Sequence, residues 1–172
     1  MARTNTDNLA RDLGRLLNEL MGLHAELAMH MRTKLDAIKR ADTDQITAIT
    51  ARELVLADRV LEREGLRRQM TRQLIAGLGV GDKLEEPVRL TVLADYLPEP
   101  GRSQVLVAAA GLRERVHEVE RLRVTSSLIT QEMLKHLGEV MTAMRSGGPS
   151  DAYGRGGKRQ RSGGAHVFEA VG

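Results

Sequence analysis

The first 86 residues of the chain contain no proline, and leucine recurs along them at intervals of three or four residues. This spacing returns to one side of an α-helix, because about 3.6 residues complete each turn. The first such ladder consists of Leu9, Leu13, Leu16, Leu20, Leu23 and Leu27. The pattern predicts long amphipathic helices that bury a narrow apolar seam against one another, as in a coiled coil or a helical bundle.

The same spacing continues beyond the first ladder, while charged and amide residues fill the positions between. These further apolar positions are Met31, Leu35, Ile38, Ile46, Ile49, Leu56 and Val60. Hydrophobic residues make up 41% of the chain, yet it has only one Phe, two Tyr and no Trp. Aliphatic side chains of this kind suit thin seams better than a thick globular core. We therefore expect an all-α fold, a long antiparallel helical hairpin or coiled-coil bundle with three main helices and a disordered C-terminal tail.

Capping residues suggest where the first two helices begin and end. Asn5 or Thr6 is expected to cap the first helix, which should run to about Arg40. The apolar stripe then fails over residues 41–44, where good capping residues cluster, and this favours a reversal of the chain. The alternative is one continuous helix over residues 6–78, because no Gly or Pro enforces the turn.

Glycines and prolines suggest how the rest of the chain is divided. The second helix should run from about Thr43 to Gly77, where a series of glycines ends it. A short helix is expected within residues 87–97, before a segment rich in proline interrupts the chain. Ser103 is the expected cap of a last long helix that ends near Arg145.

The last 27 residues differ in composition from the rest and predict two domains. Residues 1–145 should form a helical domain, and residues 146–172, rich in Gly and basic residues, a flexible tail. The chain has 26 basic and 23 acidic groups, and residues 145–172 hold five and two of them. The rest therefore has 21 of each and is neutral, so no nucleic-acid footprint is expected across the folded part.

Two features indicate the compartment. The chain has no cysteine, which excludes disulfides and thiolate chemistry and suits a reducing environment. Its N-terminus has no apolar signal core, and no run approaches the roughly 20 apolar residues that span a bilayer. We therefore expect a cytoplasmic protein without membrane insertion.

No residue pattern predicts catalysis, a metal site or a cofactor. His24 and His30 lie six residues apart on the first expected helix, and Glu26 adds only one further candidate ligand. The glycines of residues 77–81 follow a helical pattern, whereas a dinucleotide-binding loop follows a strand. We therefore expect neither an enzyme nor a cofactor.

Three segments resemble the FlgN family of flagellar export chaperones: Leu16-Leu17-Asn18-Glu19-Leu20, the stretch from Leu35 to Asp42, and the run from Leu61-Glu62-Arg63 to Arg68. The last helix and the Tyr153-Gly154 to Gly157 part of the tail are similar to the same family. Arg123 and Ser126 stand where the family usually has two asparagines.

This resemblance implies a role in binding the hook-filament junction subunits FlgK and FlgL in the cytoplasm and delivering them to the export gate protein FlhA. It also suggests that the last helix supplies the client surface, and that Tyr153 contacts the gate. The methionines of that helix are unbranched and adapt to differing partner surfaces. The expected client-binding residues are Leu122, Ile129, Met133, Leu137, Val140, Met141 and Met144.

Two other functions fit the same residues. A nucleic-acid-associated coiled-coil protein would use the basic tail as its electrostatic contact, and its binding would weaken steeply with salt. A purely structural coiled coil would instead associate strongly with itself and need no secreted partner.

Overall fold

The computed structural model describes residues 2–84 and 87–146, and within them all regular secondary structure is helical. The elements are α1 (Ala2–Lys39), α2 (Thr43–Leu78), the 3-10 turn η1 (Gly81–Lys83), α3 (Leu90–Ala94) and α4 (Gly101–Ser146). The expected all-α fold with three main helices is confirmed. The tail lies outside the described residues. None of the helices in the described ranges has the length and apolar character that crossing a membrane requires.

The chain divides into two compact units. Met1–Thr130 forms the first unit, which contains α1, α2, α3 and α4 as far as Thr130. The described residues of the second unit, Gln131–Gly172, are the last turns of α4.

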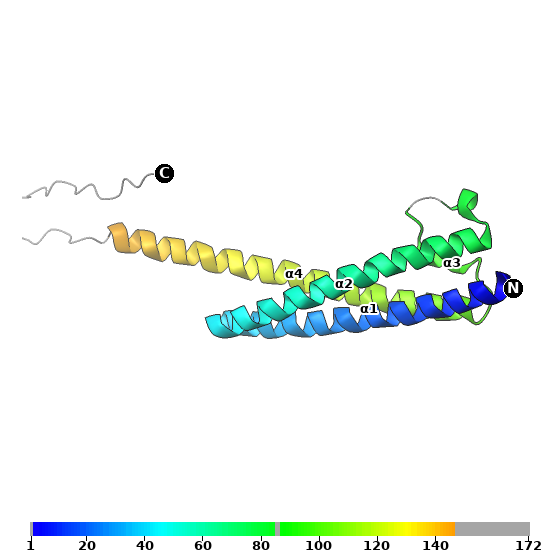
Figure 1. The fold of residues 1–172 in the computed structure, drawn as a ribbon. Helices are drawn as coiled ribbons and strands as arrows, with labels where there is room; N and C mark the ends of the chain where they lie inside the picture. Colours follow the sequence, from blue (N-terminus) through cyan, green and yellow to red (C-terminus); the bar gives the residue numbers. More distant parts are fainter. Residues whose placement is uncertain (1, 85–86, 147–172) are drawn as a thin grey trace, which may run out of the picture. The chain divides into compact units, whose positions relative to one another are not determined.

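Helices α1 and α2 form an antiparallel hairpin, in which they lie side by side (Figure 1). Every position of the predicted ladders in these two helices is buried or half-buried, which confirms the seam. Leu13, Leu17 and Leu20 have no exposed surface at all. Burying such a side chain contributes about 1.5 to 3 kcal/mol, so a row of them holds helices of this length together.

The reversal predicted at residues 41–44 is present. Ala41 adopts a left-handed backbone conformation with φ of 54°, which takes the chain out of α1. The Asp42 carboxylate then accepts a hydrogen bond of 3.0 Å from the backbone N–H of Gln45 and caps α2. A side chain that satisfies a free N–H in the first turn starts a new helix, and this is the physical reason for the break.

The predicted cap at Asn5 or Thr6 is wrong, because α1 already begins at Ala2 and includes both residues. Capping side chains stabilise a helix start only where the chain leaves the helical conformation. No glycine or proline between Ala2 and Leu9 forces the chain out of the helical conformation. The helix therefore extends about one turn further towards the N-terminus than the caps predicted.

The core lies where the two ends of the hairpin meet the connector and the start of α4. Its buried residues are Ala10, Leu13, Leu17, Leu20, Leu74, Leu93, Ala94, Leu97, Val105, Ala108 and Leu112. Two glycines of α4 allow a close approach to α1: a Cβ added at Gly101 would lie 3.0 Å from the Cβ of Ala10, and one at Gly111 would lie 2.8 Å from the Sδ of Met21.

The connector between α2 and α4 begins at Gly79, whose φ of 67° closes α2 with a left-handed turn. The short helix expected within residues 87–97 is present as α3 and places Leu93 in the core. Ser103 does not cap α4, contrary to the prediction, since α4 starts two residues earlier. The carboxylate of Glu99 performs this task and accepts a hydrogen bond from the Ser103 hydroxyl at 2.7 Å and one from its N–H at 3.3 Å.

Candidate functional site

All seven residues expected to bind a client lie on α4, but in two different settings. Leu122 and Ile129 belong to the first unit and are half-buried there. The other five belong to the second unit, and their exposed fractions range from 38% for Met133 to 72% for Met144. The aliphatic spacing of α4 is the same in both settings. Val116, Val124 and Leu128 in the first unit are exposed by 42%, 45% and 58%, whereas every residue from Gln131 to Arg145 is exposed.

An additional residue belongs to the exposed part and was missed from the sequence. Leu134 is 63% exposed and lies three residues before Leu137 and seven before Met141. Residues at these intervals share one side of a helix. With Leu134 included, the exposed ridge consists of Met133, Leu134, Leu137, Val140, Met141 and Met144. We call these six residues the α4 ridge.

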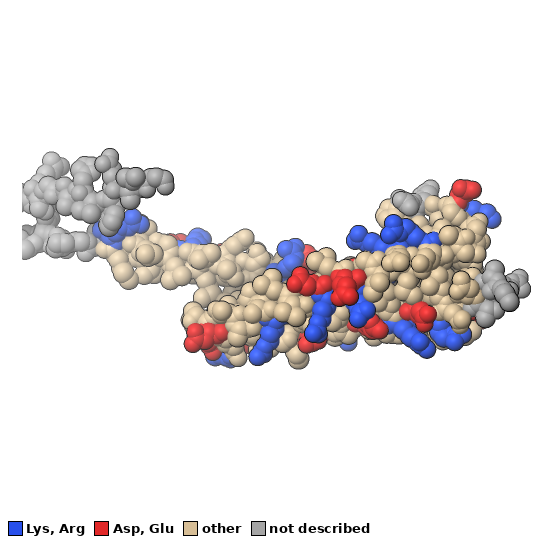
Figure 2. Space-filling view, in the orientation of Figure 1, with Lys and Arg blue, Asp and Glu red and all other residues tan. Residues whose placement is uncertain are grey.

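The polar residues of the same segment lie on the other side of the helix. Glu132, Lys135 and Glu139 alternate with the ridge residues in sequence, but the helical turn places them on the opposite side. A contact of 3.4 Å joins Glu139 to the His136 imidazole. Figure 2 shows few charged side chains on the segment of α4 that follows Thr130. An uncharged apolar stripe at this spacing is suited to packing against another amphipathic helix.

Charged side chains of α1 and α4 meet within the first unit. Glu118 of α4 accepts hydrogen bonds from Arg115 at 2.8 Å and from Arg32 of α1. The hydrogen bond from Arg115, together with the positive charges of Arg32 and Arg115, lowers the pKa of the Glu118 carboxyl below its usual value. This cluster joins two helices by charge at a point beyond the buried core.

A surface depression next to this cluster is not suited to a small molecule. Its lining consists of Glu114, Arg115, His117, Glu118 and Arg121, all from one helix. Ligand pockets are usually concave and mainly apolar, with a few converging polar groups. A wall of charged side chains from a single helix meets neither requirement.

The histidines considered in the sequence have ordinary roles. The Nδ1 atom of His24 lies 2.8 Å from the carbonyl oxygen of Leu20, within the same helix. His30 is 3.9 Å from the Glu26 carboxylate. Across residues 2–84 and 87–146, no three His, Cys, Asp or Glu side chains come together in a way that would hold a metal ion.

A family model described as FlgN protein matches residues 1–161. The chain belongs to the FlgN family. Neither the search of curated proteins nor that of solved structures found a match. The family assignment confirms the resemblance seen in the sequence, and it makes the chain a member of a family of flagellar export chaperones, which is not a family of enzymes.

The FlgN family binds flagellar hook-associated proteins in general. One of the segments that carried the resemblance now has a structural explanation, since Leu16, Leu17 and Leu20 are buried in α1. This segment of α1 is buried in the fold and is not available to a client. The exposed α4 ridge is the candidate surface for a FlgN-type client. Tyr153, the expected gate contact, lies outside the described residues.

Proposed function

We propose that this chain binds the hook-filament junction subunits FlgK and FlgL in the cytoplasm through the α4 ridge, and delivers them to the export gate protein FlhA. The family assignment supports the general role of a flagellar export chaperone. The observation that carries the specific site is the row of six exposed apolar side chains on the last turns of α4.

The physical reason for such a site is the exposure of the ridge. Each large aliphatic side chain gains about 1.5 to 3 kcal/mol when a partner buries it completely, although part of this gain offsets the cost of association. Subunits that pair only after assembly expose amphipathic helices while they are free. A client helix of this kind packs its apolar face on the ridge by helix-in-groove recognition.

The central test changes two ridge residues to aspartate. The variant Leu137→Asp with Met141→Asp should lose co-purification of FlgK and FlgL, because a buried carboxylate without a partner is costly. The matched control is Gln131→Asp with Thr142→Asp, which adds the same charge to exposed positions on the other side of the same helix segment. Circular dichroism of both variants should show the helicity of the unchanged chain.

Two outcomes would contradict this site. Client binding that survives in the ridge variant would remove the α4 ridge from the proposal. Equal loss in the variant and its control would indicate a general effect of negative charge. Ile129→Asp with Leu137→Asp should also lose the client, but Ile129 is half-buried in the first unit and this variant therefore tests the ridge less directly.

The contact with FlhA is assigned to Tyr153 in the proposed flexible tail, residues 146–172. A chain that ends at Ser146 should still bind its client and yet support less secretion. The full-length variant Tyr153→Ala, compared with Tyr153→Phe, tests the aromatic ring alone. Normal secretion by the shortened chain would exclude both the tail and Tyr153 from delivery.

A further inference from the structure

The outer side of α2 combines features that its own fold does not use. Residues 54, 58, 61, 65, 68 and 72 recur at intervals of three or four and share one side of this helix. All six are exposed, and Leu54 and Leu61 are exposed by 64% and 70%. The opposite side of α2 holds the seam residues Ile49, Leu56 and Leu74. We call the six exposed positions the outer α2 face.

The N-terminal half of this face, which we call the apolar half, carries two large apolar side chains, Leu54 and Leu61, on either side of Asp58. Val55, 55% exposed, flanks Leu54 and Leu61. A helix at the surface of a hairpin normally has one apolar side, whereas a helix with apolar residues on both sides usually lies between partners. α2 is accordingly much less amphipathic than α1. Helix α2 therefore has apolar residues on two sides. The hairpin buries the side of Ile49, Leu56 and Leu74 and leaves the side of Leu54 and Leu61 exposed.

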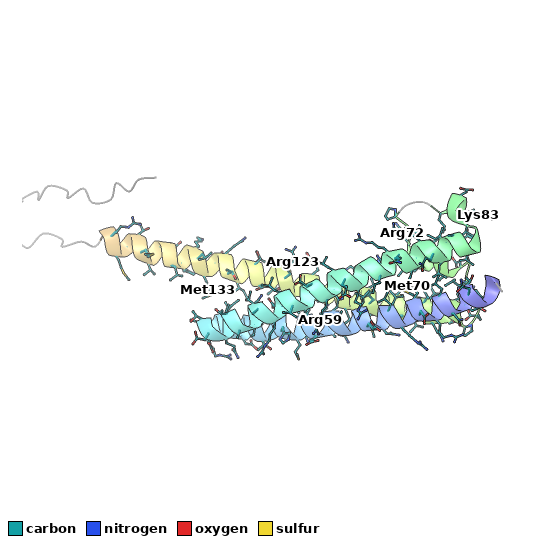
Figure 3. All side chains as sticks on the ribbon, in the orientation of Figure 1. Arg59, Met70, Arg72, Lys83, Arg123 and Met133 are labelled. Atoms are coloured by element: carbon teal, nitrogen blue, oxygen red, sulfur yellow. The ribbon has the colours of Figure 1, made fainter. Side chains whose placement is uncertain are left out.

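The C-terminal half of the same face is basic. No acidic residue occurs between Gly65 and Leu78, while three arginines do. Arg67 pairs with Glu64 at 2.8 Å, but Arg68 and Arg72 make no ion pair within the described part of the chain. Figure 2 shows basic side chains gathered over this half of α2, and Figure 3 labels Arg72 among them.

Gly65 separates the apolar half from the basic half. A Cβ added to it would meet no atom within 4 Å, so the packing of this chain does not require a glycine there. Glycine within a helix is nevertheless destabilising relative to alanine. A glycine on an exposed helix face allows the backbone of another element to approach closely, which an apolar partner would use.

We propose that the outer α2 face docks an acidic amphipathic helix of another protein. The positions from Leu54 to Arg72 span about 27 Å at 1.5 Å per residue, which is five turns of a partner helix. Leucines of that helix lie against Leu54 and Leu61, and its carboxylates lie against Arg68 and Arg72. Carboxylates favour the N-terminal turns of a helix, so the N-terminal half of the partner lies against the C-terminal half of α2. The two helices therefore run antiparallel.

Charge and composition favour a protein partner over other anions. A nucleic acid is bound through many phosphate contacts, whereas this face offers two unpaired arginines next to apolar side chains. A membrane surface would bury the Asp58 carboxylate between Leu54 and Leu61, whereas a partner helix can place a polar side chain opposite it. Two leucines followed by two arginines along one side of a helix are best matched by a helix with leucines at one end and carboxylates at the other.

The docking face shares no residue with the α4 ridge and belongs entirely to the first unit. A partner bound here and a client bound to the ridge can therefore be separated by mutation. Failure of one assignment leaves the other standing, because each is tested with its own variants.

The test uses the full chain and a synthetic fluorescent peptide of about 21 residues. The peptide has glutamates at helical spacing in its first half and leucines in its second half. We expect saturable binding in fluorescence anisotropy. The variant Arg68→Glu with Arg72→Glu should bind this peptide at least tenfold more weakly. A second peptide, with lysines in place of the glutamates, should restore binding: it should bind that variant at least tenfold more tightly than the glutamate peptide does.

Three controls make the result specific. Arg11→Glu with Arg113→Glu reverses two other exposed arginines and should leave peptide binding unchanged. Leu61→Asp should abolish peptide binding. The Arg68→Glu with Arg72→Glu variant should still capture FlgK and FlgL. Equal peptide binding by the charge-reversed variant would overturn the proposal, as would tighter binding of anionic phospholipid vesicles or a duplex oligonucleotide than of the peptide.

Discussion

The ammonium group of Lys34 on α1 donates a hydrogen bond to the carboxylate of Glu53 on α2, across the hairpin. The two side chains are only 18% and 12% exposed, and the Oε1 atom of Glu53 has no hydrogen-bond partner in the described part of the structure. A charge pair inside an aliphatic seam interrupts apolar packing. It also fixes the alignment of the two helices, because a shift of one turn would leave both charges buried without a partner.

Removal of one member of this pair should destabilise the hairpin more than removal of both. Lys34→Met should lower the free energy of unfolding by about 1 to 3 kcal/mol, because it leaves the Glu53 carboxylate partly buried and without its cation. Lys34→Met with Glu53→Leu should recover most of that loss. Urea unfolding followed by circular dichroism measures both variants. A double variant that is no more stable than Lys34→Met would contradict this view of the pair.

The Glu118 cluster predicts a defined acid sensitivity. The folded-state pKa of Glu118 lies below its ordinary value of 4.5, because Arg115 and Arg32 stabilise the carboxylate. A lowered folded-state pKa contributes stability that is present above the ordinary pKa and is lost as the pH falls through the folded-state value. Glu118→Gln should therefore lower stability at pH 7 and have little effect at an acid pH where the carboxyl is protonated in both the folded and the unfolded state.

The measurement for this cluster is a series of denaturant curves against pH, for the unchanged chain and for Glu118→Gln. A difference between the two that stays constant from pH 7 to pH 2 would contradict the assignment. Glu139→Gln is the comparison, because Glu139 belongs to the second unit and makes its contact with the neighbouring His136.

Two glycines should respond in opposite ways to an added side chain. Gly101→Val should destabilise the first unit by about 1 to 3 kcal/mol, because the Cβ position is already 3.0 Å from Ala10. Gly22→Ala should stabilise it by about 0.5 to 1 kcal/mol, since a Cβ there meets no atom within 4 Å. Thermal unfolding compares the two. A stabilising Gly101→Val would show that α1 and α4 are less closely packed at this point.

Truncation of a leucine in α2 should cost stability on the buried side of the helix and very little on the exposed side. Leu74 is completely buried in the core, and Leu74→Ala should cost about 2 to 5 kcal/mol. Leu54 is 64% exposed, so Leu54→Ala should change stability by no more than about 0.5 kcal/mol. Denaturant unfolding tests both. A large cost for Leu54→Ala would mean that the isolated chain covers the outer α2 face.

The helices and their partners were predictable because the period of the apolar positions is a direct consequence of helix geometry. The reversal before Asp42 was also predictable, since its carboxylate satisfies a backbone N–H that no other group reaches. The expected caps at Asn5, Thr6 and Ser103 were wrong. A capping side chain acts only at the point where the helix begins. Helix α1 already includes Asn5 and Thr6, and at the start of α4 the Glu99 carboxylate takes the role expected of Ser103.

The candidate surfaces were only partly predictable. The sequence located apolar positions along α4, but spacing is the same whether a partner helix lies within the chain or outside it. It could not separate half-buried Leu122 and Ile129 from the exposed α4 ridge. The outer α2 face was missed because the charge of residues 1–144 sums to zero, and this sum conceals the separate grouping of Arg68 and Arg72.

The α4 ridge also has a chemical consequence. Three of the eight methionines of the chain, Met133, Met141 and Met144, lie on it with their side chains open to solvent. Peroxide converts the thioether of methionine into a polar sulfoxide, and exposed sulfur atoms react most readily. Oxidation therefore turns half of an apolar surface polar without breaking any bond of the backbone. Reductases that act on methionine sulfoxide restore the original surface, so the proposed client surface responds to the redox state of its surroundings.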